Sequence, residues 1–281
     1  MPGRATNITF KNIHWELYRK ALIPVEPPHR NINLATEDCR KLLQLTSAWL
    51  IRWPSNWDKE KNSAFWFVIK DHYNGFGEFS RNTRSKIRRG LKRNSVRKIN
   101  KQELKQQGFP VYRNAFSRYD KVSRPLNEHE FLYRLDALDS ERYDYWGVYQ
   151  DNVLVAYAEL RYVEDVINTS VLKFHPDFLK DYSSYALLYT LIEHYLNRKD
   201  IGYITNGARS ISHDTNIQNF LIDGFRFRKA YCTLNVYYRP VLYHFLRLSY
   251  PLRNLFESLP TRLFGNFNAL LKQEYIRRNS Q

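Results

Sequence analysis

The chain has 281 residues, of which 43% are apolar and 16% aromatic, so it can bury a sizeable core and is not a disordered protein. It has no run approaching the roughly 18 apolar residues of a membrane span, and its N-terminus lacks the pattern of a secretory signal. Cys39 and Cys232 match no metal or redox spacing. We therefore expect a soluble, cytoplasmic protein with two buried free thiols and no metal.

The first part of the chain, residues 1–79, is expected to form a smaller α/β part. Apolar residues recur at helical spacing from Thr36 to Ile51, and Ala64 to Ile69 reads as a strand. The tryptophans of this part indicate an aromatic core cluster. No internal repeat is apparent.

A strongly basic segment follows. From Ser80 to Lys105 there are eleven basic residues and one acid, Glu103, so this segment carries +10 of the net charge of +16. Such a run is often a solvated helix face, but the absence of interleaved carboxylates favours binding of an anionic partner. The candidate residues are Arg84, Arg88, Arg89, Lys92 and Arg93.

Two helices are predicted near Glu103 to Tyr119 and Asn127 to Asp139. Three β-rich runs then follow, with only short turns between them, at Tyr145–Tyr149, Val153–Arg161 and Val166–Lys173. Turns this short make the three strands antiparallel neighbours.

The next stretch predicts a crossover. A helical apolar stripe runs from Ala186 to Leu196, with Asp181, Ser183 and Ser184 as candidate caps, and Tyr203 to Thr205 is a short strand. A short helix before Gly224 and a strand from Cys232 to Tyr238 complete the series. Two strands joined by one helix are expected to be parallel neighbours. Where they diverge, an extended ligand fits beside the helix N-terminus, whose amides favour phosphate.

This order of elements, together with the phrase FLIDGFRFRKAY (residues 220–231), resembles the GNAT acyltransferase superfamily. The phrase RNTRSKIRRGLKRNSVRKI (residues 81–99) resembles the Fem-type peptidyltransferases, which are built from GNAT-like halves. The resemblance implies an α/β (α+β) fold with a GNAT-like mixed central sheet and flanking helices. The acyltransferase domain would span 80–239, and 1–79 would be a truncated half. Residues 240–281 would form an amphipathic helical tail that packs on the domain, covers an acyl channel or lies on a membrane surface; packing is the default.

The resemblance implies an N-acyltransferase that moves an acyl or aminoacyl group to an amine of a small molecule or peptide. The donor would be acyl-CoA, an acyl-carrier-protein thioester or aminoacyl-tRNA. The loop KDYSSYA lacks the glycines that usually hold the pyrophosphate of coenzyme A, so a carrier protein or a tRNA, docked on the basic segment, is favoured. Donor-binding residues would be Phe174, Lys180, Ser183, Ser184 and Tyr185, and acceptor-binding residues Asn206, Arg209 and Ser210.

The candidates for catalysis are Glu159, His175, His213 and Tyr231, with Tyr185 as an alternative to Tyr231. Glu159 or His175 would act as base, although Glu159 has an equally simple interpretation as an ion pair with Arg161. His213 lies in a polar loop. Many relatives have a tyrosine as the acid at the position where this chain has Phe220, so Tyr231 or Tyr185 would supply the acid instead. The alternative to an enzyme is a non-catalytic RNA- or protein-binding module on a degenerate GNAT-like fold.

Overall fold

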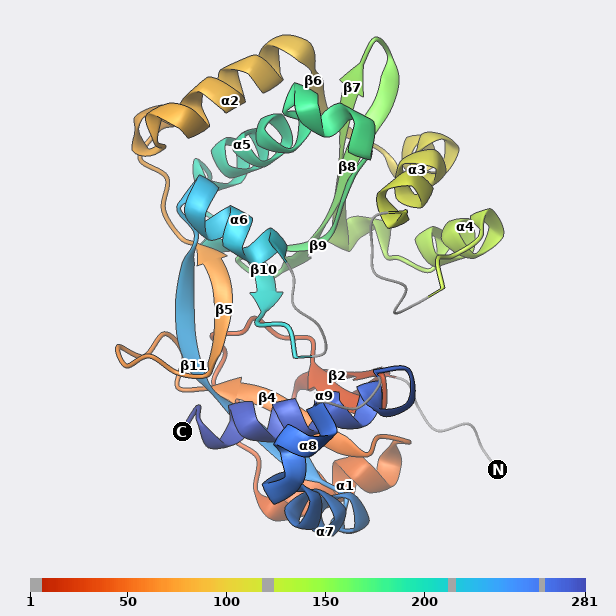
Figure 1. Cartoon of the computed structure of the whole chain (residues 1–281), viewed down its shortest axis with the longest axis vertical. Helices are drawn as coiled ribbons and strands as arrows, with labels where there is room; N and C mark the ends of the chain where they lie inside the picture. Colours follow the sequence, from red (N-terminus) through yellow and green to blue (C-terminus); the bar gives the residue numbers. More distant parts are fainter. Residues whose placement is uncertain (1–6, 118–123, 212–215, 258–260) are drawn as a thin grey trace. The chain divides into compact units, whose positions relative to one another are not determined.

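The structure is a computed structural model of the whole chain (Figure 1), and it describes residues 7–117, 124–211, 216–257 and 261–281. The chain forms two compact units. Unit 1 comprises Met1–Val68, Ala208–Asn216 and Lys229–Gln281, and unit 2 comprises Ile69–Gly207 and Ile217–Arg228. The sequence predicted consecutive domains with boundaries at residues 79 and 239. The two units are instead made of separate segments, because the strand after residue 227 pairs with a strand of the N-terminal part.

Unit 1 is built on a mixed sheet. Strands β1, β2 and β3 pair antiparallel, β3 pairs parallel with β4, β4 pairs antiparallel with β11, and β5 borders β11. Helix α1 ends at Leu45, earlier than expected, because β4 begins at Leu50. The bounds are β1 Asn7–Phe10, β2 Ile13–Tyr18, β3 Ala21–Pro24, α1 Thr36–Leu45, β4 Leu50–Ser55, β5 Phe65–Lys70 and β11 Arg228–Tyr238.

The C-terminal tail belongs to unit 1 and is helical, as expected. Leu242, Leu246 and Leu271 of the tail pack with Leu50 and Tyr238 in one apolar cluster. One side of the tail therefore packs on unit 1, as the first of the three expected roles for the tail predicts. The bounds are α7 Pro240–Ser249, the 3₁₀ turn η4 Tyr250–Leu252, α8 Arg253–Glu257 and α9 Thr261–Arg278. Of the helices in the described parts of the chain, none is long and apolar enough to cross a membrane.

Unit 2 carries the predicted meander and crossover. Its strands run in the order β10-β9-β8-β7-β6, with antiparallel pairing from β6 to β9 and parallel pairing between β9 and β10. The mixed α/β class is confirmed, and so is the expected order of an antiparallel meander followed by a parallel crossover. The bounds are β6 Ser95–Ile99, β7 Tyr143–Gln150, β8 Val153–Val163, β9 Val166–Phe174 and β10 Tyr203–Ala208.

Helices cover both faces of the unit 2 sheet. Helices α3 and α4 pack on the face that carries Tyr145, Tyr149 and Tyr157. Helix α5 packs on the other face, where Trp146 of β7 donates to the hydroxyl of Tyr195 over 2.9 Å. Helix α2 runs beside α5 (Figure 1). The bounds are α2 Arg81–Arg93, α3 Lys101–Phe116, α4 Glu128–Asp136, α5 Ser183–Leu196 and α6 Asn216–Phe225.

The start of α5 differs from the expected cap. Its N-cap is Tyr182, at φ +60°, and no side chain caps the helix. A 3₁₀ turn, η3 Pro176–Asp181, leads straight into α5, so the residues expected to cap it have other partners. Asp181 pairs with Arg93, and the hydroxyl of Ser183 donates to the carbonyl of Phe178.

Candidate functional site

The candidate site is a fork between β9 and β10. The two strands pair at Val166–Tyr203, Ile167–Ile204 and Asn168–Thr205, and in the described chain their ladder ends there. Strand β9 continues to Phe174 and stays paired with β8 on its other side. Its edge from Thr169 to Phe174 therefore lacks ladder partners on the β10 side, and an unpaired strand edge can bind an extended ligand through its backbone.

Polar side chains hold the vertex of the fork. The hydroxyl of Thr169 donates to the carbonyl of Thr205 over 3.1 Å and accepts from the amide of Asn206 over 2.8 Å. The Thr205 hydroxyl accepts from the backbone N–H of Gly207, whose φ of +78° favours glycine. Asn206, a predicted acceptor-binding residue, is thus bonded into the vertex.

Lys173, which the sequence analysis did not select, lies on the open stretch of β9. Its ammonium group is 5.6 Å from the ring centroid of Tyr112 and 5.2 Å from that of Phe116. Burial disfavours the charged form, and Arg134 adds repulsion, so the pKa of Lys173 falls to about 8. A lysine with this pKa can exchange protons near neutral pH. The sequence signal was a single lysine within the apolar run VLKF.

Glu159 lies on β8, on the α3–α4 face, and is only 1% exposed. Arg134 of α4 donates to its two carboxylate oxygens over 2.8 and 2.5 Å. Glu159 does form an ion pair, as its alternative interpretation predicted, but the cation is Arg134 and not Arg161. Each carboxylate oxygen of Glu159 accepts one bond from the guanidinium, which ties this predicted base to α4.

The remaining residues of the β9 end are arranged around the turn η3. His175 caps η3, and its Nδ1 accepts from the N–H of Asp177 over 3.4 Å. Its ring packs edge-on against Phe178. Phe174 is half-buried at the last position of β9, and Lys180 is exposed.

The three predicted donor-binding residues of α5 lie under α2. Ser183 and Ser184 are 0% and 7% exposed, so a donor phosphate reaches their hydroxyls only if neighbouring segments move. The hydroxyl of Tyr185 accepts from the ammonium of Lys86 over 3.2 Å. The Tyr185 ring packs against Phe220, the residue that stands in place of the expected tyrosine.

Other predicted residues fall in unit 1 or outside the described chain. Arg209 donates from its backbone N–H to the carbonyl of Trp66 over 2.8 Å and from its guanidinium to the carbonyl of Ala64 over 2.9 Å, which ties it to β5. Ser210 and Tyr231 are half-buried in the same unit. His213 lies outside the described residues. Of the four catalytic candidates, unit 2 therefore holds Glu159 and His175.

The basic segment divides into paired and unpaired cations. Arg93, Arg97 and Lys98 pair with Asp181, Glu103 and Asp144. By contrast, six cations of α2 have no carboxylate partner among the described residues: Arg81, Arg84, Lys86, Arg88, Arg89 and Lys92. Three of them lie over aromatic rings: Lys86 is 5.1 Å from the centroid of Tyr185, Arg88 5.0 Å from that of Phe76 and Arg89 4.8 Å from that of Tyr182. Helix α2 buries Thr83, Ile87 and Gly90 and turns its cations outward.

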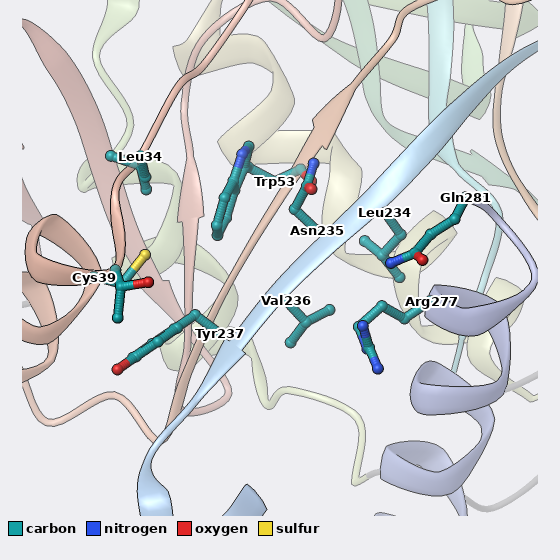
Figure 2. Close-up of a pocket in the computed structure, with 10 residues that line it drawn as sticks. Leu34, Cys39, Trp53, Leu234, Asn235, Val236, Tyr237, Arg277 and Gln281 are labelled. Carbon is teal, nitrogen blue, oxygen red and sulfur yellow. The ribbon is translucent and has the colours of Figure 1, made fainter.

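Unit 1 contains a cavity of about 190 Å³ (Figure 2). It is lined by Leu34, Thr36, Cys39, Trp53, Leu234, Asn235, Val236, Tyr237, Arg277 and Gln281. Burial raises the pKa of the Cys39 thiol to about 11, so this thiol is not a nucleophile at neutral pH. Arg277 is paired with Glu274, and the amide of Asn235 donates to Ser55. No predicted site residue lines the cavity, and the described residues contain no cluster that could hold a metal ion.

No protein-family model and no curated protein matches this chain. Solved structures do match. The C-terminal domain (DUF2156) of a putative lysylphosphatidylglycerol synthetase from Agrobacterium fabrum is 11% identical, with 73% of this chain and 71% of that chain covered and a TM-score of 0.47. FemX is also 11% identical, with coverages of 69% and 74% and a TM-score of 0.47. L-PGS from Bacillus licheniformis is 10% identical, with coverages of 95% and 86% and a TM-score of 0.48. At these identities and TM-scores the likeness carries no conclusion about the activity or substrates of this chain.

Proposed function

We propose that this chain is an acyl- or aminoacyltransferase that binds the extended arm of its donor along the open edge of β9. The observation that carries the proposal is the ladder between β9 and β10, which ends at Asn168 and Thr205 while β9 runs on to Phe174. A donor arm that contains amide groups would pair with this edge as an added strand does. The acyl carbon would then lie near the end of β9.

The reaction joins the nitrogen of an amine to the acyl carbon and breaks the thioester or ester bond. The attacking nitrogen must lose a proton, and the leaving thiolate or alkoxide must gain one. We assign both transfers to Lys173, whose lowered pKa allows a neutral amine at pH 7 to 8. His175, at the end of the same strand, is the alternative base, and Glu159 would act indirectly by holding Arg134.

We further propose that the donor is an aminoacyl-tRNA that docks on α2. The loop into α5 has no glycine, and the serine hydroxyls beside it are buried, so coenzyme A lacks an open pyrophosphate site there. Four of the six cations of α2 without carboxylate partners are arginines, which bind phosphate in a bidentate way. Arg88 and Arg89, which lie over aromatic rings, fit a nucleic acid better than an acidic carrier protein.

The test incubates the protein with labelled aminoacyl-tRNA, acyl carrier protein thioester or acyl-CoA and a panel of amines, and measures amide formation. We expect transfer from tRNA, with KM raised at least about tenfold and a shallower salt dependence in the triple variant Arg88→Gln, Arg89→Gln, Lys92→Gln. The matched control is Arg97→Gln with Lys98→Gln, because both of these cations are already paired with carboxylates. Transfer from the carrier protein or from acyl-CoA alone would overturn the choice of donor.

A second candidate function is a non-catalytic RNA-binding module, and the burial of Ser183 and Ser184 favours it. In that case no donor would support amide formation, while tRNA binding would persist and would weaken in the triple variant of α2. These two results would reject the hypothesis that the chain is an enzyme and would support the basic surface of α2 as an RNA-binding site.

A further inference from the structure

The tail of unit 1 exposes an apolar face. From Pro240 to Glu257 the chain runs through α7, η4 and α8, and its large apolar residues are exposed at steps of four, three, four and three. The exposed fractions are 75% for Val241, 53% for Phe245, 78% for Leu248, 54% for Leu252 and 61% for Leu255. Within α7 this spacing places Val241, Phe245 and Leu248 on one side of the helix, and Leu252 of η4 and Leu255 of α8 continue the exposed row. We call these five residues the tail face.

The tail face is distinct from the buried side of the tail, although the Phe245 ring also packs against that of Phe267 in α9, with 5.2 Å between centroids. Leu242 and Leu246 are buried, and together with Tyr250 and Phe256 they contact the apolar cluster of unit 1. The tail therefore has two apolar sides, of which one completes the core. Isolated exposed leucines are common on protein surfaces, but a row of five mostly aliphatic residues along one segment indicates a contact surface.

The net positive charge of the segment favours an anionic partner. Between Pro240 and Phe256 the chain has two arginines and no carboxylate, and residues 239–281 together carry seven Lys and Arg against two Glu. Arg247 precedes Leu248 in α7, so a helical step of about 100° places it at a flank of the tail face. Arg253 follows Leu252, and its guanidinium lies 5.0 Å from the ring centroid of Tyr250 and 5.8 Å from that of Tyr275. Tyr243, which is 47% exposed, adds an aromatic ring with a polar end.

We infer that the tail face docks on an anionic lipid bilayer. Apolar side chains would enter the boundary between headgroups and acyl chains, and the flanking Arg247 would meet lipid phosphates. A second copy of this chain fits less well, because apposed tail faces would bring arginines together without a carboxylate to pair with them. This inference is independent of the proposed transfer reaction.

The test is sedimentation of the full chain with vesicles made of equal parts phosphatidylglycerol and phosphatidylcholine, and with vesicles of phosphatidylcholine alone. We expect binding to the anionic vesicles at about 0.1 M salt and weaker binding at high salt. The double variant Leu248→Ser, Leu252→Ser should lower the affinity at least about tenfold, because it removes apolar area that would be buried in lipid. Arg247→Gln should lower it by a smaller factor.

The matched control is Leu45→Ser with Val153→Ser, which changes two leucine- or valine-sized side chains of similar exposure, 52% and 57%, outside the tail. This control should bind vesicles as the unmodified protein does, and circular dichroism should show all variants folded. The inference is overturned if the unmodified protein does not bind anionic vesicles, or if the tail variant binds them equally well. It is also overturned if the tail variant dissociates a dimer that has no affinity for vesicles.

Discussion

The amide of Asn206 donates to the hydroxyl of Thr169 over 2.8 Å, at the position where β9 and β10 stop pairing. The same hydroxyl donates to the carbonyl of Thr205, so one side chain bridges two residues of the neighbouring strand. These two bonds fix where the fork begins, and the proposed site depends on that position.

Thr169→Val should destabilise the protein by about 1–3 kcal/mol, because it keeps the shape of a buried residue and removes both bonds. Urea denaturation measures the change. Ser170→Ala is the control, since Ser170 is exposed and its hydroxyl is 3.5 Å from its acceptor, the Asn168 carbonyl. If the two variants are equally stable, the bridge does not hold the vertex.

Gly90 tests the close approach of α2 to α5. A Cβ atom at this position would lie 2.6 Å from the carbonyl oxygen of Tyr182 and 3.3 Å from the Cβ of Ala186. Gly90→Ala should therefore cost about 1–3 kcal/mol, even though alanine is the better helix former. Thermal unfolding with calorimetry measures it.

The matched control for Gly90 is Gly265 of α9, where an added Cβ meets nothing within 4 Å. Gly265→Ala should stabilise the protein by about 0.5–1 kcal/mol, because only the helix propensity changes. Stabilisation by both substitutions would show that α2 does not press on the start of α5.

The sequence was sufficient for the elements that depend on local signals. Short polar turns and β-branched runs predicted the meander β7–β9, and the stripe from Ala186 to Leu196 predicted the crossover helix α5. The parallel pairing of β9 with β10 follows from a single crossover. The short strand predicted at Tyr203–Thr205 matches the residues that pair with β9, although β10 itself runs on to Ala208. In each case the deciding residues are close together in the chain.

What the sequence did not predict depends on distant residues. The partner of Glu159 is Arg134, on a helix 25 residues upstream, and only the packing of α4 on the sheet brings them together. The pairing of β11 with β4 joins residues about 180 apart and makes both units discontinuous. Lys173 became a candidate because burial lowers its pKa, and no local sequence pattern predicts that burial.

Arg134 and Glu159 allow a buried ion pair to be compared with an exposed one. Arg134→Met would leave the carboxylate of Glu159 buried without its guanidinium and should cost about 3–5 kcal/mol. Arg124→Gln breaks the exposed pair with Glu130 and should cost less than about 1 kcal/mol. Urea denaturation near pH 7 compares the two. A similar cost for both variants would mean that solvent reaches Glu159.

Lys173 should give the protein a recognisable dependence on pH. Its pKa is about 8 in the folded chain, against an ordinary value of 10.5, so the folded state loses this proton first. Between these values the unfolded state binds more protons, and the contribution of Lys173 to the free energy of unfolding therefore rises with pH. Below pH 8 the cost of burying the charge is fully present. Lys173→Met should raise stability at pH 7 and flatten this rise, as urea titrations at several pH values would show.

The same residue should set the pH profile of the transfer reaction. If neutral Lys173 accepts the proton of the attacking amine, kcat/KM should rise with pH with an apparent pKa of about 8, and Lys173→Met should lose this limb together with most of kcat. His175→Asn should keep the limb, because the histidine would then only cap η3. The opposite pattern, with the limb lost in His175→Asn and kept in Lys173→Met, would transfer the role of base to His175. Because Lys173→Met is expected to be the more stable variant at pH 7, its loss of activity could not be ascribed to unfolding.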